Sequence, residues 1–311
     1  MDNVNVELFG RDPKIQKAIS VARNVSVTKA PVLIVGETGV GKRTLAKFIH
    51  QNSNREEKEL QIVDCSLESK EVENLILGYR EEDTGRFIKG ILELGNAGSV
   101  IFANIDCLED DFQKRLHKIL TELDDYDIDV RIISTTTKNL SKLVGSGRFY
   151  RGLYTLVSSN SITLTPLRER VGDLEMLARH FLNKFSEDDS NPSVDDTALN
   201  KILSHYWTYN VEELKTVIES SVSNNETGIL SEDDLAIGEK KAVSLMSDDD
   251  NEGIRLMSLK EAEKLLIKKA LIHTSENRTQ AAKILGVSIR TLRNKINEYR
   301  NVGNAYFINL R

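Results

Sequence analysis

The most constraining feature of the chain is a glycine-rich loop between a buried strand and a helix. The run 32–35 is short and wholly apolar, which is typical of a strand buried on both faces. A helical segment at 45–49 follows the loop. In such loops, glycines let backbone N–H groups wrap a phosphate, and a lysine reaches the outer phosphates. We predict a nucleotide site made of Gly36, Glu37, Thr38, Gly39, Val40, Gly41, Lys42, Arg43 and Thr44.

One position of this loop departs from the general pattern. Arg43 stands where Ser or Thr usually ligates magnesium, and Thr44 comes one residue too late for that role. The usual magnesium ligand is therefore missing. An alternative interpretation is that the glycines serve only a strand-to-helix turn, which needs positive φ angles, and that no nucleotide binds. Lys42 favours nucleotide binding, because a turn alone has no need of a lysine there.

Strand and helix patterns alternate through the first half of the chain. Asp12 and Pro13 predict the start of a helix, as its cap and its first residue. Its apolar face holds Ile15, Ala18, Ile19, Ala22 and Val25. A later helix carries Phe112, Leu116, Ile119 and Leu123. Further apolar runs at 61–64, 99–103, 131–135 and 161–164 indicate strands. This alternation predicts a parallel sheet covered on both faces.

Charge divides the chain into two parts. The formal net charge is −6, from 42 Lys and Arg against 48 Asp and Glu. Residues 254–311 carry 12 basic and 4 acidic side chains, a local charge of +8, and the remainder carries −14. The stretch 238–253 between them contains an acidic run at 247–252 without apolar periodicity. We interpret this stretch as a flexible linker, so that a small basic module follows a larger acidic one.

The basic module ends in a helix-turn-helix pattern. Helical segments at 278–285 and 289–300 flank a glycine-containing turn, and an earlier helix is expected to begin at Ser258 with Leu259, Ala262, Leu265, Leu266 and Ala270 on one side. In the last segment, the spacing of the apolar residues predicts that one set of side chains faces inward. They are Ile289, Leu292, Ile296 and Tyr299. Opposite them lie Arg290, Thr291, Asn294 and Asn297. Arg and Asn suit base edges in a major groove, and Lys a phosphate. The predicted DNA-binding residues are Arg278, Thr279, Ser288, Arg290, Thr291, Arg293, Asn294 and Lys295. The alternative is a charged face that is merely solvated.

Two observations bear on the compartment. No run of eighteen apolar residues occurs, and the amino terminus lacks a basic segment followed by an apolar one, which argues against a membrane span and a signal peptide. Cys65 and Cys107 are not spaced as a metal knuckle or a disulfide framework. We expect two buried thiols in a reducing interior, and hence a cytoplasmic protein.

With these motifs in view, the chain resembles the bacterial enhancer-binding proteins, the AAA+ activators of sigma-54 RNA polymerase. The P-loop resembles their Gly-Glu-Ser-Gly-Thr-Gly-Lys-Glu loop, which itself lacks Ser or Thr after the lysine. Segments 129–137, 164–174 and 207–214 are similar to the family's sensor strand, its Leu-Pro-Pro-Leu-Arg-Glu-Arg segment and its lid sequence. Segment 277–296 resembles the Fis-type DNA-binding domain that closes these activators. The likeness covers roughly residues 7–300.

The resemblance implies four regions. They are an AAA+ α/β core with a parallel sheet (1–167), a helical lid (168–237), the acidic linker (238–253) and an all-α Fis-type helix-turn-helix domain (254–311). It also implies ATP or ADP as the ligand and double-stranded DNA as a partner. The Fis-type module is expected to dimerise through the helix that begins at Ser258 and to bind a twofold-related site. A higher ring, and contacts with RNA polymerase or a related AAA+ activator, are further partners that the family suggests.

The chain departs from this family at the positions that carry its chemistry. The family's Asp-Glu pair, which holds magnesium and positions the attacking water, corresponds to Ala103 and Asn104. Its sensor Asn corresponds to Thr137, and its lid arginine to Glu212, whose carboxylate would repel a nucleotide. Its two arginine fingers align with Tyr150 and Leu156, where Arg148 or Arg151 can substitute after a small shift. The loop Gly-Ala-Phe-Thr-Gly-Ala, which engages sigma-54, is absent between Tyr79 and Gly85. Since phosphoryl transfer depends on positioning and charge neutralisation, we expect poor turnover or none.

The expected function is therefore that of a DNA-binding transcriptional regulator with a degenerate AAA+ domain, which binds nucleotide and hydrolyses it poorly or not at all. The recognition-helix variant resembles that of regulators of flagellar genes, so flagellar or other sigma-54-linked genes are the expected targets. An alternative is an active ATPase that remodels sigma-54 polymerase as an activator. A purely structural assembly protein is disfavoured by the ordered basic ending. No receiver domain is expected before the AAA+ region, so regulation is expected to come through nucleotide, a partner or abundance.

Overall fold

The fold was analysed in a computed structural model. It describes residues 8–81, 83–186, 193–225, 229–235, 237, 263, 266–267, 270–271, 274 and 278–301. The chain divides into two compact units, Met1–Leu245 and Met246–Arg311, and each is described by itself. The predicted linker at 238–253 and Ser258 lie outside the described residues. Among the described residues, no helix is long and apolar enough to cross a membrane.

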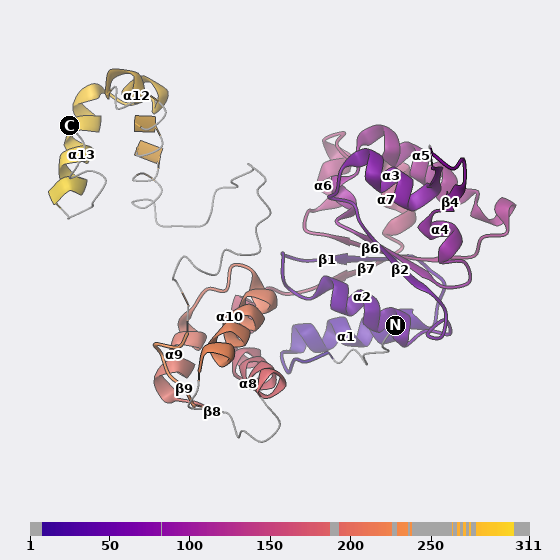
Figure 1. The fold of residues 1–311 in the computed structure, drawn as a ribbon, viewed down its shortest axis with the longest axis horizontal. Helices are drawn as coiled ribbons and strands as arrows, with labels where there is room; N and C mark the ends of the chain where they lie inside the picture. Colours follow the sequence, from indigo (N-terminus) through magenta and orange to yellow (C-terminus); the bar gives the residue numbers. More distant parts are fainter. Residues whose placement is uncertain are drawn as a thin grey trace. The chain divides into compact units, whose positions relative to one another are not determined.

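The first unit contains the predicted parallel sheet (Figure 1). Its strands, in spatial order, are β2 (Leu60–Asp64), β5 (Ser99–Ala103), β6 (Arg131–Thr136), β1 (Val32–Val35) and β7 (Asn160–Thr163). Every neighbouring pair is parallel, so all carboxyl ends meet at one edge of the sheet. The strand predicted at 161–164 begins and ends one residue earlier. The α/β fold class is thereby confirmed.

Helices cover both faces of this sheet, as Figure 1 shows. One face packs against α1 (Pro13–Ser26) and α2 (Lys42–Gln51). The other face packs against α3 (Ser69–Leu77), α4 (Ile91–Leu94), α5 (Asp110–Thr121), α6 (Leu140–Gly145) and α7 (Arg151–Val157). Short 3-10 turns, η1 (Ile105–Cys107) and η2 (Leu123–Tyr126), flank α5. Apolar burial on both faces explains why the central strands are wholly apolar.

Two helix predictions can be compared with the structure. The Asp12 carboxylate accepts a hydrogen bond from the Lys14 N–H at 2.8 Å and caps α1, and the predicted apolar face of α1 is buried. The later stripe was expected to reach Leu123 within one helix, which is wrong. Helix α5 ends at Thr121, and Leu123 begins η2, where its side chain remains buried. The apolar spacing predicted the burial of Leu123 correctly, because a 3-10 turn can continue the row of buried side chains that begins in the helix.

A helical lid follows the sheet. It comprises η3 (Leu167–Glu169), η4 (Val171–Asp173), α8 (Leu174–Phe185), β8 (Ser193–Val194), α9 (Asp196–Ser204), α10 (Asn210–Asn224) and β9 (Ile229–Leu230). Its core surrounds Trp207, which is fully buried and whose indole N–H donates to the Ile202 carbonyl at 2.9 Å. The Asp173 carboxylate accepts the Arg11 and Asp12 N–H groups at 2.6 and 3.1 Å, which ties the lid to the start of α1.

The second unit contains α12 (Arg278–Ile284) and α13 (Ile289–Asn301). Gly286 has φ +66°, and the Val287 N–H reaches back to the Ala282 carbonyl at 3.0 Å, a common way to end a helix. The small core is formed by Ile267, Ala270, Leu271, Ala281, Ala282, Leu292, Ile296 and Tyr299. The helix-turn-helix prediction is therefore confirmed.

Two apolar side chains of this unit do not lie where the spacing placed them. Ile289 was expected to face inward, but it is 37% exposed, and the adjacent Val287 is exposed as well. The inward face of α13 begins only at Leu292, because the turn presents the first residues of the helix at the surface. Leu266 is 57% exposed although Ala270, one turn later, is buried. The two therefore do not share one buried side.

Candidate nucleotide site and DNA-binding surface

The P-loop lies at the carboxyl edge of the sheet. The Gly36 N–H donates to the Thr136 carbonyl at 3.1 Å, which continues the β1–β6 pairing into the loop. Gly39 and Gly41 have φ angles of +74° and +103°, which L side chains rarely adopt. Helix α2 starts directly afterwards at Lys42. The loop therefore has the strand-turn-helix geometry that directs backbone N–H groups at an anion.

The Lys42 ammonium is folded back onto this loop. It donates to the carbonyl oxygens of Gly36 and Glu37, each at 2.9 Å, and only 9% of the residue is exposed. Burial lowers the pKa of Lys42, and the nearby Asp106 carboxylate acts in the opposite direction. To reach a phosphate, the ammonium has to exchange these two carbonyl oxygens for phosphate oxygens. The exchange keeps it hydrogen-bonded throughout, so the same lysine can serve the empty and the occupied loop.

The lid is joined to the P-loop by an ion pair. The Arg168 guanidinium donates two parallel hydrogen bonds to the Glu37 carboxylate, both at 2.6 Å, and lies over the Tyr206 ring at 5.1 Å. The Arg168 hydrogen bond is the main cause that holds the pKa of Glu37 below its ordinary value. The sequence predicted that Glu37 belongs to the P-loop. It did not predict the ion pair, because Arg168 lies 131 residues away along the chain.

Contacts from the start of α10 complete this junction. The Asn210 side-chain amide donates from Nδ2 to the Thr38 carbonyl at 2.9 Å and accepts the Leu167 N–H at Oδ1 at 2.7 Å. The Glu212 N–H donates to the Gly39 carbonyl at 3.1 Å. Glu212, which aligns with the family's lid arginine, therefore does lie beside the P-loop. Its exposed carboxylate pairs with Lys215 at 3.6 Å.

The carboxyl end of β5 holds no acidic residue of its own, but a carboxylate from β2 lies beside it. Ala103 is buried, and the Asn104 amide donates to the Asp64 carboxylate at 2.9 Å. Asp64 also accepts the Ser66 hydroxyl at 2.6 Å and the Ser66 N–H at 3.1 Å, and it forms an ion pair with Arg43. Burial acts to raise the pKa of Asp64, but the Ser66 and Asn104 hydrogen bonds and the Arg43 charge outweigh it, so the pKa is lowered.

A second acidic group near the P-loop is Asp106, in the turn after β5. Its side chain is only 2% exposed. The Thr136 hydroxyl donates to one carboxylate oxygen at 2.6 Å, and the Lys138 ammonium pairs with the other at 3.1 Å. Sequence reasoning missed both Asp64 and Asp106. The signal that could have found them is their place directly after buried parallel strands, where side chains gather at one edge.

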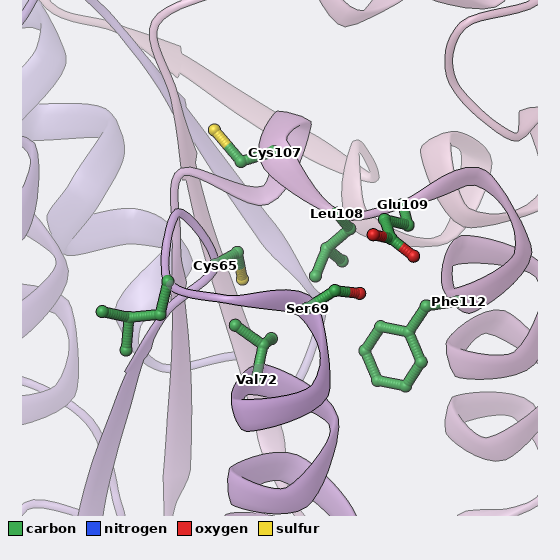
Figure 2. A pocket seen from close by; sticks show the side chains of 8 residues that line it. Cys65, Ser69, Val72, Cys107, Leu108, Glu109 and Phe112 are labelled. Atoms are coloured by element: carbon green, nitrogen blue, oxygen red, sulfur yellow. The ribbon is translucent and has the colours of Figure 1, made fainter. Parts of the chain in front are cut away.

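The two cysteines lie next to a small pocket of about 100 Å³, shown in Figure 2. Cys65 is buried, whereas Cys107 is exposed, so the expectation of two buried thiols is wrong for Cys107. It lies in the short turn η1, which leaves the sheet edge. The sulfur atoms point away from each other in Figure 2, and burial raises the pKa of both thiols. The pocket is well below the volume of sites that bind small organic ligands.

A larger pocket of about 680 Å³ lies between α5, α6 and α7. Tyr150, which aligns with one of the family's arginine fingers, lines it together with Arg151. Arg148 is exposed nearby in the chain and donates to the Ser146 hydroxyl at 3.2 Å. The exposure of Arg148 and Arg151 is compatible with the substitute role that the sequence suggested, which stays a prediction.

The segment in which the family's sigma-54 loop is predicted to be absent forms a short hairpin. Strands β3 (Gly78–Arg80) and β4 (Phe87–Lys89) pair antiparallel, and the Glu81 N–H donates to the Arg86 carbonyl at 2.9 Å. Tyr79 and Phe87 are 43% and 46% exposed. The connection between β3 and β4 is therefore closed directly after the paired strands by the contact between Glu81 and Arg86.

In the second unit, most of the predicted DNA-binding side chains form an exposed surface. Those that are exposed are Thr279, Ser288, Arg290, Thr291, Arg293 and Asn294. The Ser288 hydroxyl accepts the Thr291 N–H at 3.0 Å and caps α13, so Ser288 has a structural role as well. Arg278 is half-buried. Lys295 is half-buried too and pairs with Glu263 at 2.9 Å, whose carboxylate also accepts the Tyr299 hydroxyl at 2.8 Å. The side chain of Asn297 lies outside the described residues.

Comparison with known proteins gives matches to three family descriptions. Residues 8–163 match the Sigma-54 interaction domain, residues 168–244 the AAA+ ATPase lid domain, and residues 258–299 the Fis family of bacterial regulatory proteins. A signal-transduction and transcriptional-control protein of Clostridium beijerinckii is 33% identical, over 94% of this chain and 48% of that protein. Regulatory protein AtoC of Escherichia coli K12 is 30% identical, over 94% of this chain and 67% of that protein. The chain thus spans about half to two thirds of these relatives.

Among solved structures, NtrX from Brucella abortus in complex with ADP has a TM-score of 0.66 and 19% sequence identity. The match covers 94% of this chain and 69% of that chain. At this identity, the likeness supports the fold, namely a P-loop sheet with a helical lid and a carboxyl-terminal helical module.

Proposed function

Because the chain belongs to the family of sigma-54-dependent transcriptional regulators, we propose that it is a DNA-binding regulator whose AAA+ domain binds ATP or ADP and hydrolyses it poorly or not at all. In this proposal the nucleotide serves assembly or sensing in the bacterial cytoplasm, where the DNA lies. Flagellar or other sigma-54-linked genes are the proposed targets. Double-stranded DNA, a second copy of the chain, and RNA polymerase or a related activator are the proposed partners.

The proposal of poor ATP hydrolysis is supported mainly by the residues at the end of β5. Ala103 has no ligand atom, and Asn104 uses its amide to hydrogen-bond Asp64. A water molecule that attacks a phosphate needs a group to orient it and take up its proton, and an amide cannot take up a proton. At the position that aligns with the family's lid arginine, Glu212 supplies no cation to stabilise the transferred phosphate.

The alternative, a working ATPase that remodels sigma-54 polymerase, is favoured by one observation. Asp64 and Asp106 bring carboxylates to the edge of the sheet from which the usual pair is missing. In that case one of them would replace the lost acidic residue. Both are held by cations, Arg43 and Lys138 respectively, which disfavours that role.

The decisive experiment measures nucleotide binding and steady-state ATP hydrolysis on the same purified protein, with magnesium, beside Lys42→Ala. We expect binding by the wild type, at least tenfold weaker binding by Lys42→Ala because the buried ammonium is lost, and no turnover above that of the variant. Turnover of several per minute that disappears in Lys42→Ala would instead establish the active ATPase.

A further inference from the structure

A magnesium ion is the usual companion of a nucleotide in this family, and the residues near the P-loop can be tested for their fit to it. Mg²⁺ in nucleotide sites is held by one or two carboxylates together with phosphate oxygens and several waters, in a near-octahedral arrangement. The residue after the P-loop lysine is Arg43, and the end of β5 offers Ala103 and Asn104. Within the described part of the chain, no group of three or more His, Cys, Asp or Glu could hold a metal.

The carboxylates that do lie near the loop have their oxygen atoms already engaged. One Asp64 oxygen accepts from Asn104 and twice from Ser66, and the other is paired with Arg43. One Asp106 oxygen accepts the Thr136 hydroxyl, and the other is paired with Lys138. A metal ion at either carboxylate would lie beside the cation that already neutralises this group and would be repelled by its charge. The residues present therefore do not fit Mg²⁺.

The same contacts place fixed positive charges where the metal charge is usually supplied. Arg43 extends from the first turn of α2, beside Lys42, to the ends of β2 and β5 through Asp64 and Asn104. Lys138 follows β6 and is held by Asp106, whose charge acts on Lys42. Asp64 and Asp106 thus serve as anchors for two cations rather than as ligands for a third.

Arg43 is also available to an incoming anion. Its side chain is 55% exposed, and among the described residues Asp64 is its hydrogen-bond partner. A guanidinium carries five N–H donors in a planar fork that matches two phosphate oxygens. Arg43 can therefore keep its ion pair with Asp64 and still donate to a phosphate.

We propose that this site binds nucleotide without a divalent cation, and that the Arg43 guanidinium, supported by Lys138, provides the positive charge which a bound Mg²⁺ would otherwise provide. The ligand is the free polyphosphate anion of ATP or ADP rather than its magnesium complex. The inference rests on the proposed function, because it presupposes that the P-loop binds nucleotide. Beyond nucleotide binding, it specifies the metal-free form of the nucleotide as the ligand and Arg43 as the residue that selects this form.

The test measures the Kd of ADP for the full chain by calorimetry, in buffers of matched ionic strength that contain either MgCl₂ or EDTA. We expect the two Kd values to agree within about threefold, since no metal ligand is contributed by the protein. A Kd at least about tenfold weaker in EDTA overturns the inference and leaves nucleotide binding intact. Failure to bind in either buffer overturns the inference together with the nucleotide-binding part of the proposed function.

Variants locate the effect at Arg43. Arg43→Ala should weaken ADP binding in EDTA about tenfold, and Arg43→Lys should recover part of the loss because it keeps the charge but not the fork. The matched control is Arg115→Ala, which removes an equally exposed arginine (58%) from a surface ion pair with Glu73. Equal losses in Arg43→Ala and Arg115→Ala would count against the assignment, as would no loss in either.

Asp64→Asn provides a second, independent variant. It removes a carboxylate charge from the site while retaining a side chain of the same shape. We expect ADP binding in EDTA to tighten several-fold, because the site then repels the polyphosphate less and Arg43 can still donate to it. If Asp64 is instead a metal ligand, the same variant weakens binding in MgCl₂ and leaves binding in EDTA unchanged, which overturns the inference.

Discussion

Glu37 shows how one side chain serves two parts of the structure. It belongs to the P-loop by sequence, and its carboxylate holds the lid through Arg168. Because the pair lowers the pKa of Glu37 below the ordinary value of 4.5, it stabilises the folded state wherever the carboxylate is charged. This contribution is fully present above the unfolded-state pKa and is lost as the pH falls through the lowered folded-state pKa.

We therefore expect Glu37→Gln to be less stable than the wild type at neutral pH and to converge with it in acid, below the folded-state pKa. The Glu37 side chain is 42% exposed, so solvent screening keeps the difference at about 1 kcal/mol or less. Urea unfolding across a pH series measures it. Glu175→Gln, which removes an exposed i,i+4 pair with Arg179, is the control and should change stability by no more than a few tenths of a kcal/mol at any pH. A constant deficit of Glu37→Gln down to the lowest pH would contradict the ionic origin.

At the scale of an element, the loop between β1 and α2 is shaped by its glycines in two different ways. Gly39 and Gly41 both have positive φ angles, so a side chain at either strains the backbone. A β-carbon at Gly39 would also overlap the backbone oxygen of Tyr209 in the lid, whereas a β-carbon at Gly41 meets no atom within 4 Å. Only Gly39 is therefore required by the lid as well as by the turn.

This difference predicts unequal effects of two otherwise matched substitutions. Gly41→Ala should destabilise the first unit by about 1 to 2 kcal/mol through backbone strain alone. Gly39→Ala should cost at least about 1 kcal/mol more, because the lid has to shift away from the P-loop. Urea unfolding gives the two free energies, and limited proteolysis after η4 reports on the lid. Equal costs would show that the lid contact with Gly39 is weak.

At the scale of the whole molecule, charge divides between segment 254–311 and the rest of the chain. The body outside 254–311 carries −14 and is a poor partner for DNA, whereas the terminal part carries +8 and exposes Arg290 and Arg293 on α13. Lys295 is paired with Glu263, so Arg293 is the better candidate for the predicted DNA contact. The overall charge of −6 would disfavour DNA binding only if the charges were spread evenly over one domain.

We expect Arg293→Ala to weaken binding of the full chain to a promoter fragment about tenfold, and to make the salt dependence shallower by about one counterion if the contact is to a phosphate. Arg179→Ala, an exposed arginine of the lid, changes the net charge equally and should leave the affinity unchanged. Fluorescence anisotropy at several salt concentrations measures the affinity and its salt dependence for each variant. An affinity and a salt slope identical to those of the wild type would remove Arg293 from the DNA-binding surface.

Local patterns sufficed wherever the determining residues are neighbours along the chain. The cap at Asp12, the buried run at 32–35, the positive-φ glycines before α2 and the turn at Gly286 each follow from a few adjacent residues. The apolar spacing of α13 failed at Ile289, because whether the first turn of a helix is covered depends on what packs against it. The absence of the family's acidic pair at Ala103 and Asn104 was predicted from the family resemblance and stays a prediction.

By itself, the sequence determined the P-loop, the parallel α/β core and a basic helix-turn-helix module, since hydrophobic period and glycine placement act over short distances. The lid was implied by the family resemblance. Only the tertiary structure decided which charges meet. Asp64 contacts Asn104 across 40 positions, and Arg168 contacts Glu37 across 131. Such pairs depend on parallel strands that end at one edge and on a lid that returns to it. Spacing along the chain carries no information about them, because an ion pair depends on separation in space.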